Sequence, residues 1–198
     1  MTPRDTILTA VRRNLPRPSV PLPDYPKFPE KGEPILPYFR RQLEVMGGRS
    51  FEVANSTAAR AKVAELFPDA KVVCSASAEI PGTRWIQDVH DPHGLNDVDV
   101  GVVRSPLGVA ETGAIWLTQG ELVVNALAVL SQHLVVLLDP NAIVESMHAA
   151  YDHLDLAASP YGVFLAGPSA TGDIEGVVIQ GAQGARSLTV VFLAKTGG

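Results

Sequence analysis

Residues 133–140 read HLVVLLDP, a run of consecutive apolar residues that ends in an acid and a proline. A strand that is covered on both faces needs apolar side chains on both, so such a run is typical of a central strand in a parallel sheet. We expect further strands at 49–54, 71–76, 97–105, 109–119, 161–167 and 187–194, and helices at 35–48, 56–70 and 141–154. This alternation predicts an α/β domain with a mainly parallel sheet and flanking helices.

The expected helix at 56–70 carries local signals at both ends. Ser56 or Thr57 can cap its first turn, and Pro68 ends it. Its apolar face is expected to comprise Ala61, Ala64, Leu66 and Phe67.

The N-terminal part of the chain differs from the rest. Residues 4–15 place apolar side chains at helical spacing, and nine of the 16 prolines fall within residues 1–37. Proline cannot join a central sheet or helix, so this segment predicts an extended arm with polyproline character. It is either a floppy linker or an arm that docks on its own domain or on a second subunit. We therefore divide the chain into residues 1–34, a helix and proline-rich arm, and residues 35–198, the α/β domain.

Composition narrows the class of protein. The longest apolar run, LVVNALAVL at 122–130, is shorter than the roughly 20 residues of a membrane-spanning helix. The first 16 residues lack the pattern of a secretory signal, so a cytoplasmic protein is expected. Residues 1–104 hold 14 Lys and Arg against 13 Asp and Glu, whereas residues 105–198 hold two against eight. Without a basic stripe, nucleic-acid binding is not expected.

Cys74 is the only cysteine, so this chain alone cannot form a disulfide or hold a cysteine-ligated iron–sulfur cluster. Because Cys74 lies at the end of an expected strand, a buried, inert thiol is the preferred interpretation, and a nucleophile is the alternative. The stretch DVHDPHG at 88–94 could offer metal ligands, but a solvated loop is the preferred interpretation, and we expect no metal on this chain. The cofactor, if any, is unknown.

Three loops are candidates for a site, because ligands of α/β sheets bind outside the carboxyl ends of strands. In GVAETGAIW at 108–116, Glu111 could be a nucleophile, a general base or a hydroxyl-binding group, or an exposed residue in a hairpin turn. In GAQGARSL at 181–188, Arg186 could neutralise a bound carboxylate or phosphate, or lie on the surface. His133 could point into the site or cap the sheet.

The second loop, GPSATGDIE at 167–175, reads as a turn from a strand into a helix. Ser169 or Thr171 can cap that helix, and Asp173 would lie in its first turn. The free N–H groups of the cap could instead hold a phosphate or a carboxylate.

Two of these stretches carry a resemblance. GVAETGAIWL at 108–117, followed by GPSATGDIEGVVIQGAQGARSLTVV at 167–191, resembles the lactate utilisation protein C (LutC/YkgG) family, whose shared unit is the LUD domain. The opening helix and arm, ILTAVRRNLPRPSVPLPDY at 7–25, are similar to that family as well. The resemblance implies a fold like the NagB/RpiA/CoA transferase group and a role in organic acid metabolism, the oxidation of L-lactate to pyruvate beside separate iron–sulfur LutA/LutB-like partners.

The resemblance also selects site residues. The candidate residues that match the family pattern are Glu111, Thr112, Gly113, Gly167, Pro168, Ser169, Thr171 and Asp173. Among the candidates we expect Glu111 to be catalytic, and a small carboxylate or phosphate to be held by the other matching residues together with Arg186. The preferred function is an accessory or subunit protein that is not redox-active by itself. The alternative is a freestanding enzyme, similar to a CoA transferase or a sugar-phosphate isomerase, that uses Glu111. The third hypothesis is a structural interaction module whose proline-rich arm recruits a partner or mediates self-association.

Overall fold

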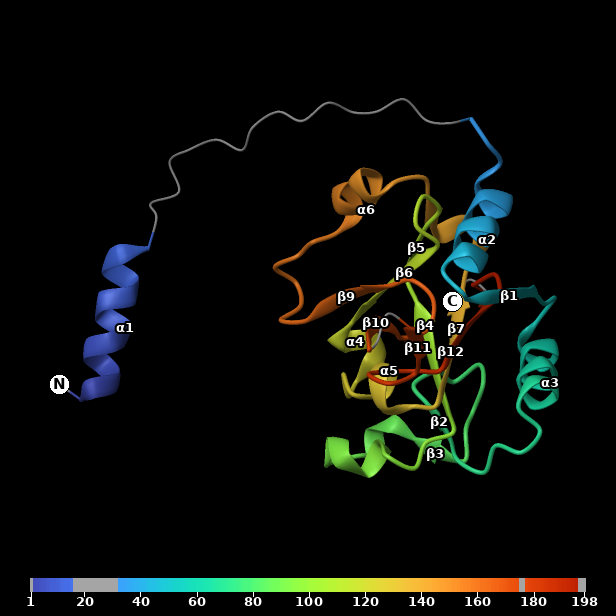
Figure 1. Ribbon diagram of the computed structural model, residues 1–198, viewed down its shortest axis with the longest axis horizontal. Helices are drawn as coiled ribbons and strands as arrows, with labels where there is room; N and C mark the ends of the chain where they lie inside the picture. The colour runs from blue at the N-terminus through green and yellow to red at the C-terminus, as the bar shows by residue number, and fades with distance from the viewer. Residues whose placement is uncertain (1, 16–31, 175–176, 196–198) are drawn as a thin grey trace.

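The computed structural model describes residues 2–15, 32–174 and 177–195, apart from the side chains of residues 173 and 174 (Figure 1). The helices are α1 (Pro3–Asn14), α2 (Ile35–Val45), α3 (Ser56–Leu66), α4 (Gln119–Leu122), α5 (Leu127–Leu130) and α6 (Met147–His153). The strands are β1 (Arg49–Glu52), β2 (Val73–Ser75), β3 (Arg84–Trp85), β4 (Val100–Ser105), β5 (Leu107–Val109), β6 (Ala114–Thr118), β7 (His133–Leu138), β8 (Ile143–Val144), β9 (Gly162–Leu165), β10 (Ala170–Ile174), β11 (Val177–Gln180) and β12 (Ser187–Phe192).

The main sheet has six strands in the order β1-β12-β7-β4-β2-β3, and every neighbouring pair is parallel. This confirms the expected α/β fold. The run at 133–140 supplies β7, which lies between β12 and β4, and residues 134–138 are all buried. Alternate residues of β7 enter two different cores, so both faces of the strand are covered, as its continuous apolar sequence requires.

The two faces of the main sheet are covered differently (Figure 1). On one face, Ala59 and Val63 of α3 pack against Val135 and Leu137 of β7. On the other face, the core includes buried residues from α2, α4, α5 and the smaller sheet. Most of the elements outside the main sheet therefore pack on the second face. The loops of the predicted site lie on this side.

Helix α3 forms where it was expected, and Phe67 packs against the core as predicted, but the cap and two residues of the predicted apolar face, Ala61 and Ala64, were wrong. Asn55 is the N-cap, and its side chain accepts a hydrogen bond from Ala58 N at 2.9 Å. Ala61 and Ala64 are exposed, whereas Ala59 and Val63 are buried. Alanine contributes little to an apolar face, so the choice between two neighbouring stripes depends on where the sheet lies.

A second sheet, in the order β8-β5-β6-β9, was not predicted. β5 and β6 form an antiparallel hairpin whose turn is at residues 110–113, within the stretch 109–119 that was expected to be one strand. β9, the YGVFLAG segment, pairs antiparallel with β6 rather than joining the parallel sheet. The expected helix at 141–154 starts only at Met147, because residues 143–144 pair with β5 as β8.

The stretch GPSATGDIE is followed by no helix, which corrects the prediction of a strand-to-helix turn. Residues 170–174 form β10, which pairs antiparallel with β11. Thr171 lies opposite Ile179 in this hairpin, so neither Ser169 nor Thr171 caps a helix. Hydroxyl, glycine and carboxylate residues favour turns as well as helix caps, and the apolar residues at 177–179 supply a strand partner.

The N-terminal helix α1 forms as predicted, with a capping box between Thr2 and Asp5. None of its residues is buried, and Ile7, Val11 and Leu15 expose more than half of their surface. Residues 16–31 of the proline-rich arm lie outside the described part of the chain. Among the residues that the structure describes, no helix is long and apolar enough to cross a membrane.

Candidate functional site

Two of the three predicted loops meet at the C-terminal end of α2. The register of β6 and β9 pairs Ile115 with Leu165, so continuing it by two residues brings Gly113 opposite Gly167. Both glycines have positive φ, 64° and 74° respectively. A Cβ atom on Gly113 would lie 2.3 Å from Leu43 N, and one on Gly167 would lie 2.1 Å from Met46 O. Both glycines therefore let a loop approach the backbone of α2, so the structure explains them as packing positions.

Glu111 lies at the turn between β5 and β6 and is exposed. Its Oε2 accepts a hydrogen bond from Met147 N at 3.0 Å, and its own N–H donates to Glu145 O. The neighbouring Thr112 hydroxyl lies 4.0 Å from Met147 Sδ. Glu111 thus caps the first turn of α6 from a separate strand pair, where its negative charge complements the helix end.

We expect Glu111→Gln to lower the free energy of unfolding by about 0.5–1 kcal/mol, because the amide keeps the hydrogen bond and loses the charge at the helix end. Urea unfolding of the two proteins measures this change. Glu65→Gln, an exposed residue paired only with Lys62 among the described residues, is the control and is expected to change stability less. The alternative function, in which Glu111 is a nucleophile, instead predicts an acyl adduct in the wild type that Glu111→Gln lacks.

The second and third loops form one unit. Ser169 N donates to Ala185 O, and Gly181 N donates to Ser169 O, both at 2.9 Å. A cavity of about 320 Å³ lies between this unit, α5 and the end of β9, and Pro168, Gln183 and Leu188 are part of its lining. The two loops GPSATGDIE and GAQGARSL therefore lie next to each other, as expected. The side chain of Asp173 lies outside the described residues.

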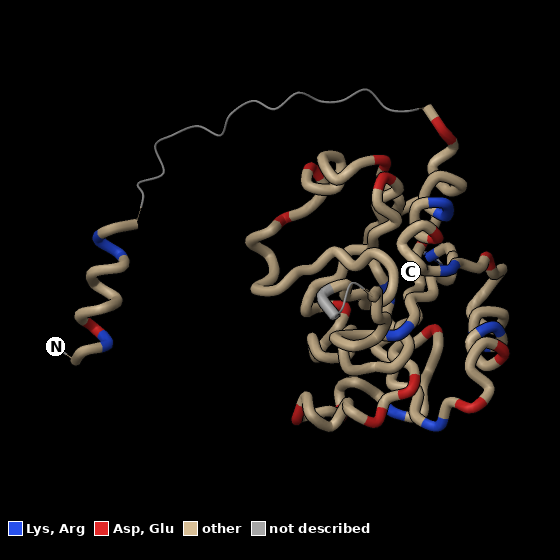
Figure 2. Tube along the Cα trace, in the orientation of Figure 1, with Lys and Arg blue, Asp and Glu red and all other residues tan. Residues whose placement is uncertain are grey.

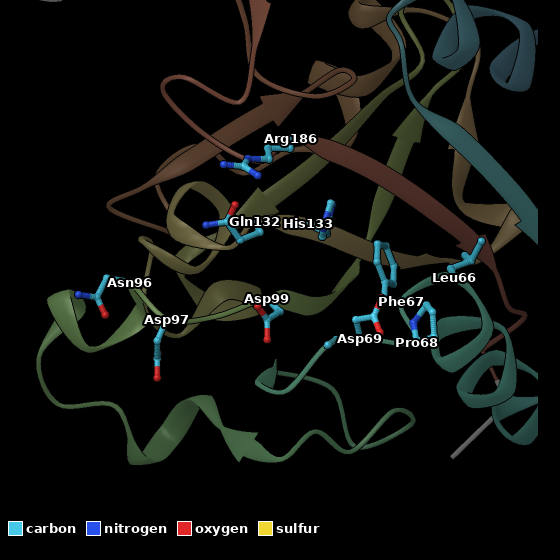
Figure 3. Close-up of a pocket in the computed structure, with 11 residues that line it drawn as sticks. Leu66, Phe67, Pro68, Asp69, Asn96, Asp97, Asp99, Gln132, His133 and Arg186 are labelled. Atoms are coloured by element: carbon cyan, nitrogen blue, oxygen red, sulfur yellow. The ribbon is translucent and has the colours of Figure 1, made fainter.

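Arg186 lies at the opposite edge of the main sheet from the one predicted. It directly precedes β12, so it is at the amino ends of the parallel strands, and its N–H donates to Gln132 O at 2.8 Å. There it borders a groove of about 540 Å³ (Figure 3). Figure 3 shows Arg186, Gln132 and His133 along one side of this groove and Asp99 across from them.

His133 connects the groove to the sheet. Its Nδ1 is 2.8 Å from Ser187 Oγ, and its ring lies 4.9 Å from that of Phe67. The guanidinium of Arg49 in turn lies 5.4 Å from the Phe67 ring. Burial, followed by the charges of Arg49 and Arg186, lowers the pKa of His133. The imidazole is therefore neutral at pH 7, and an anion between it and the arginines would favour its protonation.

Three carboxylates line the groove, and two of them, Asp97 and Asp99, have partners, whereas none is seen for Asp69 among the described residues. Asp99 accepts from the backbone N–H groups of Lys71 and Val72, and these bonds lower its pKa. Asp97 forms two 2.8 Å contacts with Arg84. Arg186, by contrast, has no ion pair or side-chain hydrogen bond among the residues described here. Because it has no such partner, its charge is available to an anionic ligand. Arg186 is also one of only two Lys or Arg residues after position 104. Figure 2 shows that Lys and Arg are sparse and unevenly distributed over the molecule.

Sequence reasoning missed Arg49, Phe67 and Asp99 as neighbours of Arg186, and left the orientation of His133 open. Arg49 and His133 are the first residues of β1 and β7, and Asp99 and Arg186 directly precede β4 and β12. The signal that could have identified these residues is a polar residue at, or directly before, the start of each of these four apolar strands. Parallel strands align these positions at one edge of the sheet.

Cys74 of β2 is fully buried, and burial raises the pKa of its thiol, which accords with an inert residue. Across the described ranges, the structure contains no group of three or more His, Cys, Asp and Glu side chains placed to hold a metal ion.

Comparisons with known proteins agree with this architecture. A family model described as the LUD domain matches residues 93–193. No curated protein matches the chain. The crystal structure of a DUF162 family protein from Deinococcus radiodurans is similar, with a TM-score of 0.58 and 18% sequence identity over 80% of this chain and 95% of that one. At this identity the similarity concerns the fold alone.

Proposed function

Because this chain belongs to the LUD domain family, we propose that it is a cytoplasmic accessory or subunit protein of the lactate utilisation protein C type, acting in the oxidation of L-lactate to pyruvate. The family is associated with lactate utilisation, and this association carries the proposal. The protein would bind a small carboxylate without carrying out the electron transfer itself.

The division of labour is implied by the family resemblance, and the cysteine content agrees with it. One buried cysteine cannot ligate an iron–sulfur cluster, so the redox centre would belong to separate partners of the LutA/LutB type. In this proposal the present chain supplies the anion site. Arg186 is its centre, because its unpaired guanidinium borders the groove and belongs to the same loop that Ser169 contacts.

The other residues that the sequence predicted for the ligand site are supported to different degrees. Pro168 and Ser169 line the cavity beside the loop of Arg186, which favours a place near the ligand. Thr112, Gly113, Gly167, Thr171 and Asp173 stay predictions as ligand-binding residues, and Glu111 stays a prediction as a catalytic residue.

Reconstitution of lactate oxidation tests the proposal. The iron–sulfur partners are purified and assayed for L-lactate-dependent electron transfer, alone and with this protein. We expect a higher rate with the protein present, and a smaller increase with Arg186→Met. Equal rates with and without the wild-type protein would refute the accessory role.

Deletion of the N-terminal segment tests the arm. Helix α1 buries none of its residues, so we propose that its apolar stripe is covered on association, either with a second copy or with a partner. A chain that lacks residues 1–34 is expected to keep its urea unfolding midpoint and to lose self-association or partner binding. An unchanged molecular mass, together with unchanged partner binding, would exclude this role.

A further inference from the structure

A second hollow shares Gln132 and Arg186 with the groove. It has a volume of about 350 Å³ and is bordered by α5, by the turn at 181–184 and by Arg186 itself. Polar residues, among them Ser131 and Gln183, line part of it, and Val129, Leu130 and Ala182 form its apolar wall; Val129 and Leu130 expose 45% and 39% of their surface. Arg186, whose guanidinium has no ion pair or side-chain hydrogen bond among the described residues, therefore borders both the groove and a hollow with an apolar wall.

The position of Arg186 is held by the surrounding backbone. Its N–H is bonded to Gln132 O, and its side-chain stem lies close against Gly181, leaving the charged end between the two hollows. Ser131, which also lines the second hollow, is buried and donates to Leu127 O, so it closes the C-terminal end of α5. The apolar wall is thus carried by a helix whose end is fixed, and the backbone of Arg186 is held beside it.

We propose that these two features form one site for an amphiphilic monocarboxylate, whose carboxylate binds Arg186 and whose hydrocarbon part lies on Val129 and Leu130. The inference rests on the proposed function, because it names the ligand class of the same anion site. Apolar walls with a few polar groups are the usual composition of small-molecule sites. A guanidinium pairs with a carboxylate through two parallel hydrogen bonds, which orients the rest of the ligand. The carbon chain can then extend toward α5 and away from Asp99 and Asp97.

The proposal predicts a dependence of affinity on chain length. Acetate, lactate, butyrate, hexanoate and octanoate are titrated into the full-length protein by calorimetry at one pH and one salt concentration. Each added methylene that leaves water on the apolar wall is expected to increase affinity by roughly twofold to fourfold, until the hollow is filled. Equal affinity for butyrate and octanoate would overturn the inference.

Variants separate the two parts of the site. Val129→Asn and Leu130→Asn are expected to abolish the chain-length dependence and to leave acetate and lactate binding nearly unchanged. Arg186→Met is expected to weaken all five ligands by about tenfold or more, since hydrogen bonds to charged groups are the stronger ones. Lys195→Met is the matched control, because it removes the other late positive charge at an exposed position beyond β12, and it should leave every affinity unchanged.

The outcomes also separate this inference from the proposed function. If the short acids bind and the long acids bind no better, the anion site stands and the apolar subsite does not. If no acid binds while the protein still stimulates lactate oxidation, the accessory role stands and the anion site does not. Binding of octanoate that is insensitive to both Arg186→Met and Leu130→Asn would place the ligand elsewhere and refute the site.

Discussion

Gly167→Ala is expected to lower the free energy of unfolding by about 2–5 kcal/mol, the combined effect of backbone strain and overpacking. Gly167 has a φ of 74°, which L-residues with a Cβ rarely adopt. Its Cβ would lie 2.1 Å from Met46 O, so the loop could keep its place only if the end of α2 moved. The backbone before Gly167 is held by the pairing of Leu165 with Ile115, and the backbone after it by the bonds between Ser169 and the 181–185 turn, which leaves little room for that movement.

Urea unfolding followed by circular dichroism measures the change, and Gly94→Ala is the control. A Cβ on Gly94 meets no atom within 4 Å, and its φ is not positive, so the same substitution should be close to neutral there. If Gly167→Ala unfolded at the wild-type midpoint but lost carboxylate binding, the residue would belong to a ligand site rather than to the contact with α2. This result would restore the interpretation from the sequence.

Phe39→Ala is expected to cost about 3–5 kcal/mol, the range for removing a fully buried aromatic ring. Phe39 lies in α2, exposes none of its surface and packs edge-to-face on Phe192 of β12, with ring centroids 5.8 Å apart. Its ring also lies close to Gly108, because a Cβ atom added at Gly108 would be only 3.1 Å from the ring. One side chain therefore joins α2 to both sheets, and its loss leaves a cavity where they meet.

Thermal and urea unfolding test this prediction together, because a protein of this size loses roughly 2–4 °C in Tm for each kcal/mol. Val11→Ala in α1 is the control, since Val11 is 53% exposed and is expected to change stability little. A loss below about 1 kcal/mol for Phe39→Ala would show that α2 does not anchor the loops of Gly113 and Gly167. The binding proposals do not depend on this outcome.

The candidate site could be predicted only in part. The sequence identified Arg186 as an isolated late charge and paired its loop with GPSATGDIE, and the structure joins these loops through Ser169 and Ala185. The rule that ligands bind at carboxyl ends placed Arg186 at the wrong edge of the sheet. The position of Arg186 at the start of β12 could be predicted from the sequence. Its alignment with Arg49, Asp99 and His133 could not, because it depends on the order of the strands in the assembled sheet.

The parallel sheet and its central strand could be predicted from the residues alone, because a strand buried on both faces must be apolar at consecutive positions, and HLVVLLDP is. The same holds for the conclusion that one cysteine cannot hold a cluster. That residues 170–174 form a strand depends on the assembled fold, since turns and helix caps use the same residues and the difference lies in the partner, β11. The assembled fold likewise decides that Gly113 and Gly167 face α2, because a glycine shows where a side chain is excluded but not which backbone excludes it.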